Sequence, residues 1–365
     1  MSSLEPILGE PLSLTSPALP LHGVSVVICC YNSSDRLTPT LEALGDVDQA
    51  HLFAWEILLI DNGSTDGAVK PAAQNCPPHL RPRIRICSEA QPGLSSARLR
   101  GIREARYDII SFIDDDNWVC RDWISRVVAI FDNHPAVGVV GGPSIPVFEQ
   151  APPRWFNRIS GFYAIGPQHR LSGDITETPG TLLWGAGLSL RRNALLELLQ
   201  RGFQFSLTDR TGGNLSTGGD TELCLSLRAS GWRFWYDDQL TLRHFIPAMR
   251  IQWSYARTLM QGMGRASVII NVYLIAFGRH PFERAPEYSQ TWPFQFARVL
   301  KEFLKILVAH PFKSLRCSDG CQECLTFETR RAALCQIWEL RAKYSNLISR
   351  IRSARWNTGQ NRDRS

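Results

Sequence analysis

Three consecutive aspartates, Asp114, Asp115 and Asp116, are the residues in the sequence most suggestive of chemistry. Adjacent carboxylates repel one another, so the three are stable together only in water or around a cation. Side chains alternate along an extended chain, so Asp114 and Asp116 share one side and can converge on one ligand. Their oxygens suit Mg²⁺ or Mn²⁺, which commonly complete their shell with ligand phosphates. The alternative is a solvated acidic turn that caps the helix after Trp118.

Two later residues can act beside the triplet. Asp220 follows Gly218-Gly219 and stands where a helix would begin, so it is either an N-cap or a general base facing a cleft. His244 ends a strand-like run. A lone histidine is more often structural, but an imidazole beside a carboxylate pair can complete a metal site.

Strand-like and helical stretches alternate over the first part of the chain. Strand-like runs cover residues 24–30, 56–60, 83–87, 108–113 and 137–140, and helical patterns cover 35–44, 65–74, 94–105 and 123–133. This alternation predicts a parallel sheet covered by helices on both faces. Ligands bind beyond the carboxyl ends of such strands, where Tyr31-Asn32, Asp61-Asn62-Gly63 and the aspartate triplet stand. Taken alone, Asp61-Asn62-Gly63 is equally well explained as a solvated turn.

The remaining segments are less regular. Residues 1–22 are rich in Pro, Ser and Leu, which predicts a flexible N-terminal segment. Residues 144–180 are rich in Pro and aromatic residues and indicate an irregular excursion over one face. The pattern then predicts short strands at 233–236 and 240–244, followed by helices at 251–276, 294–309 and 325–351.

Composition and charge exclude several classes of protein. The chain has 365 residues, 44% of them hydrophobic and 20% charged, which is ordinary globular composition with room for two units. The formal net charge of +6 is held by residues 341–365, so the body is neutral and no nucleic acid is expected as a partner. The first strand-like run is not followed by Gly-x-Gly-x-x-Gly, which excludes a Rossmann dehydrogenase. The lead-in lacks the basic start of a secretory signal, and the apolar run 268–277 is too short to span a bilayer.

The ten cysteines are too few for a disulfide scaffold, and we expect reduced, cytosolic thiols. The spacing of Cys317, Cys321 and Cys324 leaves two interpretations. One is a metal site with Cys335 as a fourth ligand at unusual spacing. The favoured one is a helical hairpin with reduced thiols.

Seven motifs together resemble the family 2 glycosyltransferases of the GT-A fold. They occur in order at residues 24–32, 59–66, 93–98, 111–117, 184–192, 219–227 and His244, so the resemblance covers about residues 23–245. It implies an α/β fold with a GT-A-type, mixed but mainly parallel nucleotide-binding sheet flanked by helices, and a helical C-terminal extension. The implied domains are a flexible segment at 1–22, a glycosyltransferase domain at 23–245, and a helical region with a basic tail at 246–365.

The resemblance also implies roles for individual residues. Asp220 matches the catalytic base, and Asp116, Asp114 and His244 match the ligands of a divalent cation, Mg²⁺ or Mn²⁺. The nucleotide-sugar contacts that it implies are Tyr31, Asn32, Asp61, Arg98, Asp114, Trp184 and Gly185. Two positions depart from the family pattern, because Gly219 stands before Asp220 where Glu is common, and Leu99 follows Arg98 where Asn is common.

The implied activity is metal-dependent, inverting, hexosyltransferase-like transfer of a sugar from a nucleotide-diphosphate sugar to a hydroxyl. A UDP-sugar is the favoured donor, although Asp61 suits guanine as well as uracil or thymine. The expected acceptor is a glycan or a lipid-linked molecule in polysaccharide or glycolipid biosynthesis. The alternative is a non-catalytic nucleotide-sugar-binding protein of the same fold. We expect a cytoplasmic protein, with the amphipathic stretch from Phe294 either packed on the catalytic domain or docked peripherally at the inner face of a membrane.

Overall fold

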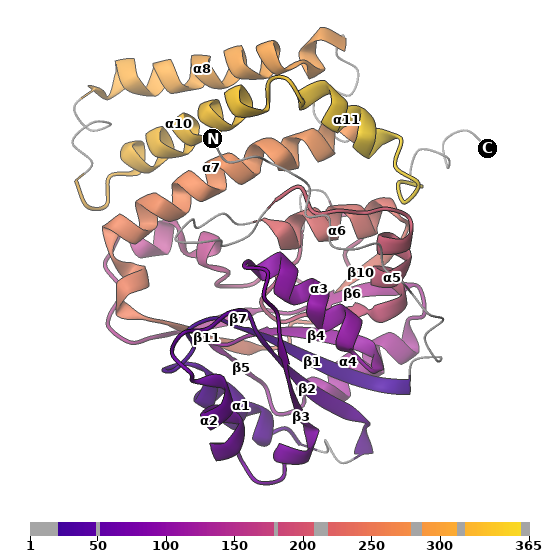
Figure 1. Ribbon diagram of the computed structural model, residues 1–365. Coiled ribbons are helices and arrows are strands. Elements are labelled where there is room, and N and C mark those ends of the chain that lie inside the picture. The colour runs from indigo at the N-terminus through magenta and orange to yellow at the C-terminus, as the bar shows by residue number, and fades with distance from the viewer. Residues whose placement is uncertain are drawn as a thin grey trace.

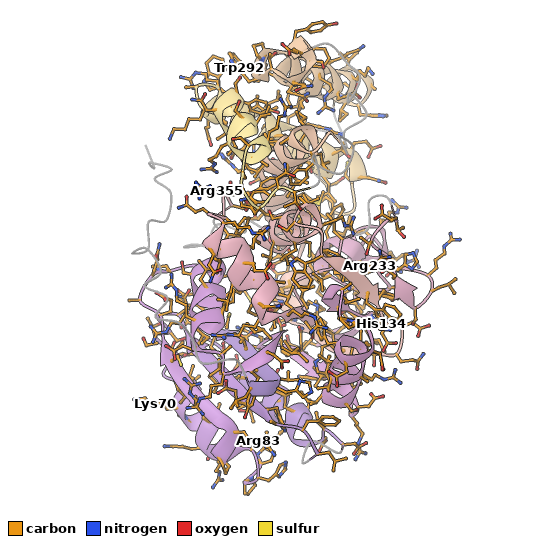
Figure 2. The ribbon with its side chains drawn as sticks, turned by 90° about the vertical axis from the view of Figure 1, so that its right-hand side faces the viewer. Lys70, Arg83, His134, Arg233, Trp292 and Arg355 are labelled. Carbon is orange, nitrogen blue, oxygen red and sulfur yellow. The ribbon has the colours of Figure 1, made fainter. Side chains whose placement is uncertain are left out.

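The computed structural model describes residues 21–48, 52–178, 182–207, 218–278, 287–311 and 318–358 (Figure 1). Residues 1–20 of the predicted flexible segment therefore lie outside the described residues, whereas Leu21 and His22 already form the start of the first strand. The helical C-terminal region is stacked on one side of a central sheet. Figure 2 shows the molecule along its long dimension, with Trp292 near the helical end and Lys70 near the sheet end.

An eight-stranded mixed sheet forms the centre, in the order β3-β2-β1-β4-β9-β6-β10-β8. Its strands are β1 (Leu21–Cys30), β2 (Trp55–Asp61), β3 (Ile84–Ser88), β4 (Tyr107–Asp114), β6 (Val137–Gly141), β8 (Gly173–Asp174), β9 (Leu188–Arg191) and β10 (Arg233–Tyr236). Strands β1 to β4 are mutually parallel, and β10 is parallel to β6. Strand β9 runs antiparallel to both β4 and β6. The expected mixed, mainly parallel sheet flanked by helices is confirmed.

Both faces of the sheet are buried, which explains the continuous apolar strands in the sequence. Val26 and Ile28 face a cluster that includes Trp123 of α4, whereas Val27 faces the other cluster with Ala97 of α3. The helices over these faces are α1 (Leu37–Gly45), α2 (Val69–Asn75), α3 (Leu94–Glu104), α4 (Trp123–Asn133), α5 (Arg192–Gln200) and α6 (Gly219–Ala229).

A second, three-stranded sheet lies beside the end of β4. It consists of β5 (Asn117–Val119), β11 (Leu242–Ile246) and β7 (Ser144–Phe148), in the order β5-β11-β7. The segment expected to be irregular therefore contributes β7 and β8, together with the short helices η3 (Phe156–Arg158) and η4 (Ser160–Tyr163). This small sheet pairs His244 with Asn117, directly after the aspartate triplet.

Four helices form most of the described C-terminal region: α7 (Trp253–Ala276), α8 (Trp292–Ala309), α10 (Gln322–Leu340) and α11 (Tyr344–Arg352). The prediction of one helix over 325–351 is wrong, because a turn in which the N–H of Lys343 donates to the carbonyl of Leu340 separates α10 from α11. The turn allows Leu340 and Tyr344 both to be buried. Helix α11 thus packs into the core with Tyr344, Ile348 and Ile351.

The C-terminal helices share the core of the sheet. The same apolar cluster holds Val27 of β1, Val272 of α7 and Ile337 of α10. Among the described residues, α7 is the one helix long and apolar enough to cross a membrane, but 61% of its most apolar window is buried in the protein. Such burial is what a core helix requires.

Candidate active site

The carboxyl ends of three neighbouring strands bring the predicted donor residues together. In the sheet, Cys30 of β1 is paired with Asp61 of β2, and Cys29 is paired with Asp114 of β4. Residues 31–32, Asp61 and the aspartate triplet therefore occupy one edge, as parallel strands require. The sequence predicted this meeting correctly.

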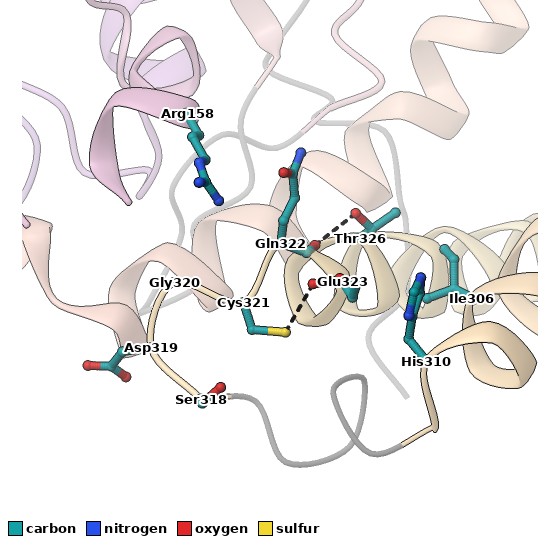
Figure 3. Close-up of a pocket in the computed structure, with 10 residues that line it drawn as sticks. All are labelled: Arg158, Ile306, His310, Ser318, Asp319, Gly320, Cys321, Gln322, Glu323 and Thr326. Carbon is teal, nitrogen blue, oxygen red and sulfur yellow. Dashed lines mark hydrogen bonds between the residues drawn. The ribbon is translucent and has the colours of Figure 1, made fainter. Parts of the chain in front are cut away.

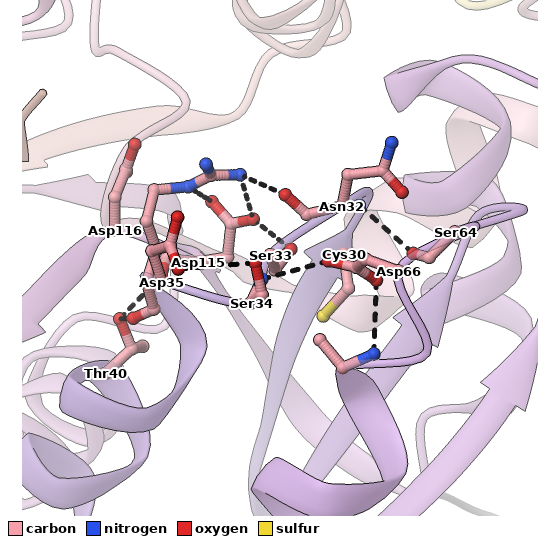
Figure 4. A network of polar contacts seen from close by, with 12 residues as sticks. Cys30, Asn32, Ser33, Ser34, Asp35, Thr40, Ser64, Asp66, Asp115 and Asp116 are labelled. Atoms are coloured by element: carbon pink, nitrogen blue, oxygen red, sulfur yellow. Dashed lines mark hydrogen bonds and ion pairs between the residues drawn. The ribbon is translucent and has the colours of Figure 1, made fainter.

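A small hydrogen-bond network links the loops after β1 and β2 (Figure 4). Asn32 has a left-handed backbone with φ of 49°, its N–H donates to Ser64 Oγ at 3.2 Å, and its Oδ1 accepts the Thr65 N–H at 2.9 Å. Asp61 Oδ1 accepts the N–H of Ser64 at 3.0 Å. Beside this network the Tyr31 side chain is exposed. The two loops thus present an aromatic ring and a carboxylate, a combination suited to a nucleotide base.

The three aspartates occupy different environments. Asp115 is buried, accepts a short hydrogen bond from the Ser33 hydroxyl, and forms an ion pair with Arg36 at 3.1 Å (Figure 4). Burial and the neighbouring Asp116 raise the pKa of Asp115, while Arg36 and Ser33 oppose the rise. Asp115 therefore holds the β1 loop to the end of β4. Asp114 is partly exposed, and its N–H donates to Asn117 Oδ1 at 3.3 Å.

Asp116 is almost fully buried and is surrounded by polar partners. Its Oδ2 accepts a hydrogen bond from Arg250 Nη1 at 2.8 Å. Its Oδ1 accepts one from Asn117 Nδ2 at 3.1 Å and lies 3.5 Å from His244 Nε2. Burial lowers the pKa of Arg250, but Asp116, Tyr255 and Asp115 outweigh this effect and raise it. Arg250 was missed by the sequence analysis, because nothing in its local pattern separates it from the other arginines of the chain.

Of the three predicted metal ligands, Asp116 and His244 lie together. Within the described ranges, no group of three His, Cys, Asp or Glu side chains is close enough to hold a metal ion, so Asp114 does not join Asp116 and His244 in such a cluster. The carboxylate and the imidazole face each other, and the buried His244 Nδ1 has no hydrogen-bond partner among those residues. A divalent cation that takes one carboxylate and completes its shell with phosphates fits this pair.

Asp220 lies in the first turn of α6, against the loop before β9. Its Oδ2 accepts the N–H of Gly185 at 2.7 Å, and its Oδ1 accepts the N–H of Thr221 at 2.8 Å. A Cβ atom on Gly185 would collide with the guanidinium of Arg98, so Arg98 lies in the same corner. Arg98 extends from α3 over the Phe112 ring, 5.6 Å from its centroid. Three residues predicted from separate motifs thus meet here.

Arg98 also lies near Cys29, at the strand ends that carry Asp114. Burial raises the pKa of Cys29 to about 12, an effect that Arg98 opposes and Asp114 strengthens, so both charges lie near this thiol. Trp184, the neighbour of Gly185, is half-buried, and its N–H donates to Gln168 Oε1 at 2.5 Å. The loop that holds Trp184 and Gly185 therefore contacts Gln168, Arg98 and the start of α6.

Glu222, the other carboxylate in the first turn of α6, is poorly placed to act as the base. It is fully buried and accepts hydrogen bonds from the Tyr273 hydroxyl at 2.6 Å, the Ser206 N–H at 2.7 Å and the Leu207 N–H at 3.0 Å. Burial raises its pKa, against the effect of these donors. Glu222 therefore ties α6 to α7 and to the chain before residue 208.

A separate open pocket of about 670 Å³ lies between η3 and the helices α8 and α10 (Figure 3). Arg158, Glu323 and Cys321 are among its lining residues, and Cys321 Sγ lies 3.4 Å from Glu323 Oε2. Cys324 takes part in a disulfide, so the expectation of a reduced thiol is wrong at this position. Cys317 lies outside the described residues, and Cys321 and Cys335 are free thiols.

Comparison with known proteins adds independent information. Residues 25–198 match the family model described as glycosyl transferase family 2, a range that ends before Asp220 and His244. The glucosyl-dolichyl phosphate glucuronosyltransferase of Haloferax volcanii is 24% identical over 245 residues, which cover 66% of this chain and 76% of that protein. The undecaprenyl-phosphate 4-deoxy-4-formamido-L-arabinose transferase of Salmonella choleraesuis is 32% identical over 118 residues, or 32% of this chain and 35% of that protein.

Among solved structures, residues 1–349 of S. aureus TarS align with a TM-score of 0.47 and 13% identity, over 89% of this chain and 91% of that one. Five of the seven motifs overlap the matched range, and those at 219–227 and His244 lie beyond it. Residues 25–198 thus match glycosyl transferase family 2, and these curated relatives are glycosyltransferases.

Proposed function

We propose that the protein transfers a sugar, with inversion, from a nucleotide-diphosphate sugar to a hydroxyl group, and that Asp220 is the base. The observation that carries this proposal is the fixed corner of Asp220, Gly185 and Arg98. Inversion in one displacement needs no protein nucleophile, only a carboxylate that removes the proton of the incoming hydroxyl. A rigid backbone contact keeps the carboxylate in one orientation, which is what proton transfer requires.

The donor is proposed to bind along the strand ends. Tyr31 and Asp61 contact the base, Asn32 positions the two loops, and Asp114 and Arg98 lie toward the ribose and the sugar phosphates. We keep a UDP-sugar as the favoured donor; a uracil imide N–H can donate to the Asp61 carboxylate, as a guanine edge also can.

We also propose metal dependence. Asp116 and His244 would hold Mg²⁺ or Mn²⁺, with Asp114 on the donor side of the same edge. When bound, a divalent ion neutralises the charge that develops on a departing diphosphate. The protein's own contribution is the buried carboxylate and imidazole, whose atoms stand 3.5 Å apart.

The proposed acceptor is a polyprenyl-phosphate-linked or other glycan. Two relatives are named for dolichyl phosphate and undecaprenyl phosphate substrates. We propose that residues 246–365 form the helical region that serves this acceptor, with the boundary near residue 245. The outer side of α8 exposes Leu304 and Val308 beside Lys301 and Lys305, and α8 lies farthest from the sheet (Figure 1). Apolar and basic side chains on one helix face favour contact with an anionic membrane surface.

A direct test is incubation of the purified protein with UDP-, GDP- and dTDP-sugars, Mn²⁺ and polyprenyl phosphate acceptors. We expect release of the nucleoside diphosphate that depends on the acceptor, together with a glycosylated product of inverted anomeric configuration. Binding or slow hydrolysis of donors with no acceptor-dependent product would favour the alternative, a non-catalytic nucleotide-sugar-binding protein.

A further inference from the structure

Arg250 forms an ion pair with Asp116, the carboxylate that the proposed metal ion requires. Its Nη1 lies 2.8 Å from Asp116 Oδ2, and both side chains are largely shielded from water, with 16% and 3% of their surface exposed. A charge-assisted hydrogen bond in a buried place is among the stronger polar contacts in proteins. The free protein therefore already neutralises Asp116 with a cation of its own.

The backbone of Arg250 is held firmly. Its carbonyl accepts the Tyr163 hydroxyl at 3.0 Å, and its N–H donates to the Pro247 carbonyl at 2.9 Å. The next residue, Ile251, is buried in an apolar cluster with Tyr163. The anchor is thus fixed, whereas the long side chain can move its guanidinium over several ångströms by changing rotamer.

Arg250 and a divalent ion cannot both neutralise Asp116 without repelling each other. Asp116 offers two oxygens, one engaged by Arg250 and the other facing His244. Two positive centres on one buried carboxylate repel strongly where the dielectric constant is low. A phosphate oxygen close by would relieve this conflict, since a guanidinium pairs with phosphate as well as with carboxylate.

We propose that Arg250 is the resident counter-ion of Asp116, that a divalent cation displaces it, and that the released guanidinium then binds the diphosphate of the donor. The exchange replaces one anionic partner of Arg250 with another and leaves no buried charge unpaired. It also makes metal and donor binding mutually supportive, because each removes an obstacle to the other. This inference rests on the proposed function, whose donor it addresses.

The experiment uses the full chain and two probes, Mn²⁺ alone and UDP. Mn²⁺ affinity is measured by electron paramagnetic resonance without nucleotide, and UDP affinity by calorimetry with saturating Mn²⁺. We expect Arg250→Gln to bind Mn²⁺ about tenfold more tightly than the wild type, and UDP about tenfold more weakly, as loss of a charge-assisted contact implies. Arg257→Gln is the matched control, since Arg257 pairs with the buried Glu328 on the same helical region, at 2.6 Å; it should change neither affinity.

Arg250→Lys keeps the positive charge, and it tests the proposed exchange if Arg250→Gln does not fold. It should retain the Mn²⁺ affinity of the wild type and bind UDP several-fold more weakly, because the planar fork is lost. Equal Mn²⁺ affinity of the wild type and Arg250→Gln would overturn the exchange, as would wild-type UDP affinity in both variants. A wild type that binds no UDP with Mn²⁺ present would instead refute the proposed donor, and the Mn²⁺ comparison would still test the displacement.

Discussion

The N–H of Gly185 donates a hydrogen bond of 2.7 Å to Oδ2 of Asp220, which joins the loop before β9 to the first turn of α6. A side chain at this position would meet both the Arg98 guanidinium and the Asp220 Cβ. The contact places a carboxylate and a guanidinium on either side of one small residue. The proposed base is thus oriented by backbone rather than by another flexible side chain.

Gly185→Ala should therefore damage the proposed transfer. The added methyl group must displace Arg98 or Asp220, and misplacing a catalytic group by about 1 Å can lower the rate roughly 10²-fold. The measurement is kcat and KM, with circular dichroism as a check of folding. Gly161→Ala is the matched control, because a Cβ at Gly161 meets nothing within 4 Å. Equal rates for the two variants would show that the corner does not orient the reaction.

Removal of divalent metal should abolish transfer. Treatment with EDTA followed by desalting is expected to leave no acceptor-dependent product, and Mn²⁺ or Mg²⁺ should restore it. Asp116→Asn should prevent this restoration while preserving most of the packing around the residue. Transfer at the full rate in excess EDTA would contradict the assignment of Asp116 and His244.

The burial of Glu222 should make the stability of the folded protein depend on pH. Burial raises its pKa above the ordinary value of 4.5, so the folded state binds its proton more tightly than the unfolded state. Its stabilising contribution is complete below the unfolded pKa and is lost as the pH rises through the folded pKa. The unfolding free energy of the wild type, relative to Glu222→Gln, should therefore fall as the pH rises above 4.5 in urea titrations. A difference that rises with pH would show that the hydrogen bonds to the carboxylate outweigh its burial.

Contact of α8 with a membrane can be tested by neutralising its outer face. Lys301→Gln with Lys305→Gln should weaken binding to phosphatidylserine vesicles about 10- to 30-fold, since each basic group near such a surface contributes roughly 1 kcal/mol. The control pair is Lys70→Gln with Arg81→Gln, two exposed residues, of which Lys70 lies at the sheet end of the molecule (Figure 2). If both pairs reduce vesicle sedimentation equally, the binding is non-specific.

Much of the fold follows from local patterns. The strands from Val24 and Glu56 are visible in the sequence because burial on both sheet faces demands continuous apolar residues. The helix at 123–133 is visible because its buried residues recur at helical spacing. The break between α10 and α11 was not predictable in this way. It depends on Tyr344 packing into a core made mostly by distant residues.

The site residues likewise fall into those that the sequence predicts and those that only the folded structure reveals. The strand-end rule placed Asp61 beside the aspartate triplet, and motif order suggested Asp220 and Arg98. The role of Asp115 as a buried tether, and the pairing of Arg250 with Asp116, depend on contacts between residues separated by 79 and 134 positions. Such long-range partners leave no periodic signal, so only the folded chain reveals them.

The central claim, that Asp220 is the base of sugar transfer, is tested most directly by Asp220→Asn. Asparagine keeps the size of the side chain and can still accept the Gly185 N–H, but its amide takes no proton at neutral pH. Loss of a general base typically lowers the rate about 10²- to 10⁴-fold. We predict a fall of kcat in this range, with donor affinity within about threefold of the wild type. Full activity, or loss of donor binding, would contradict the assignment.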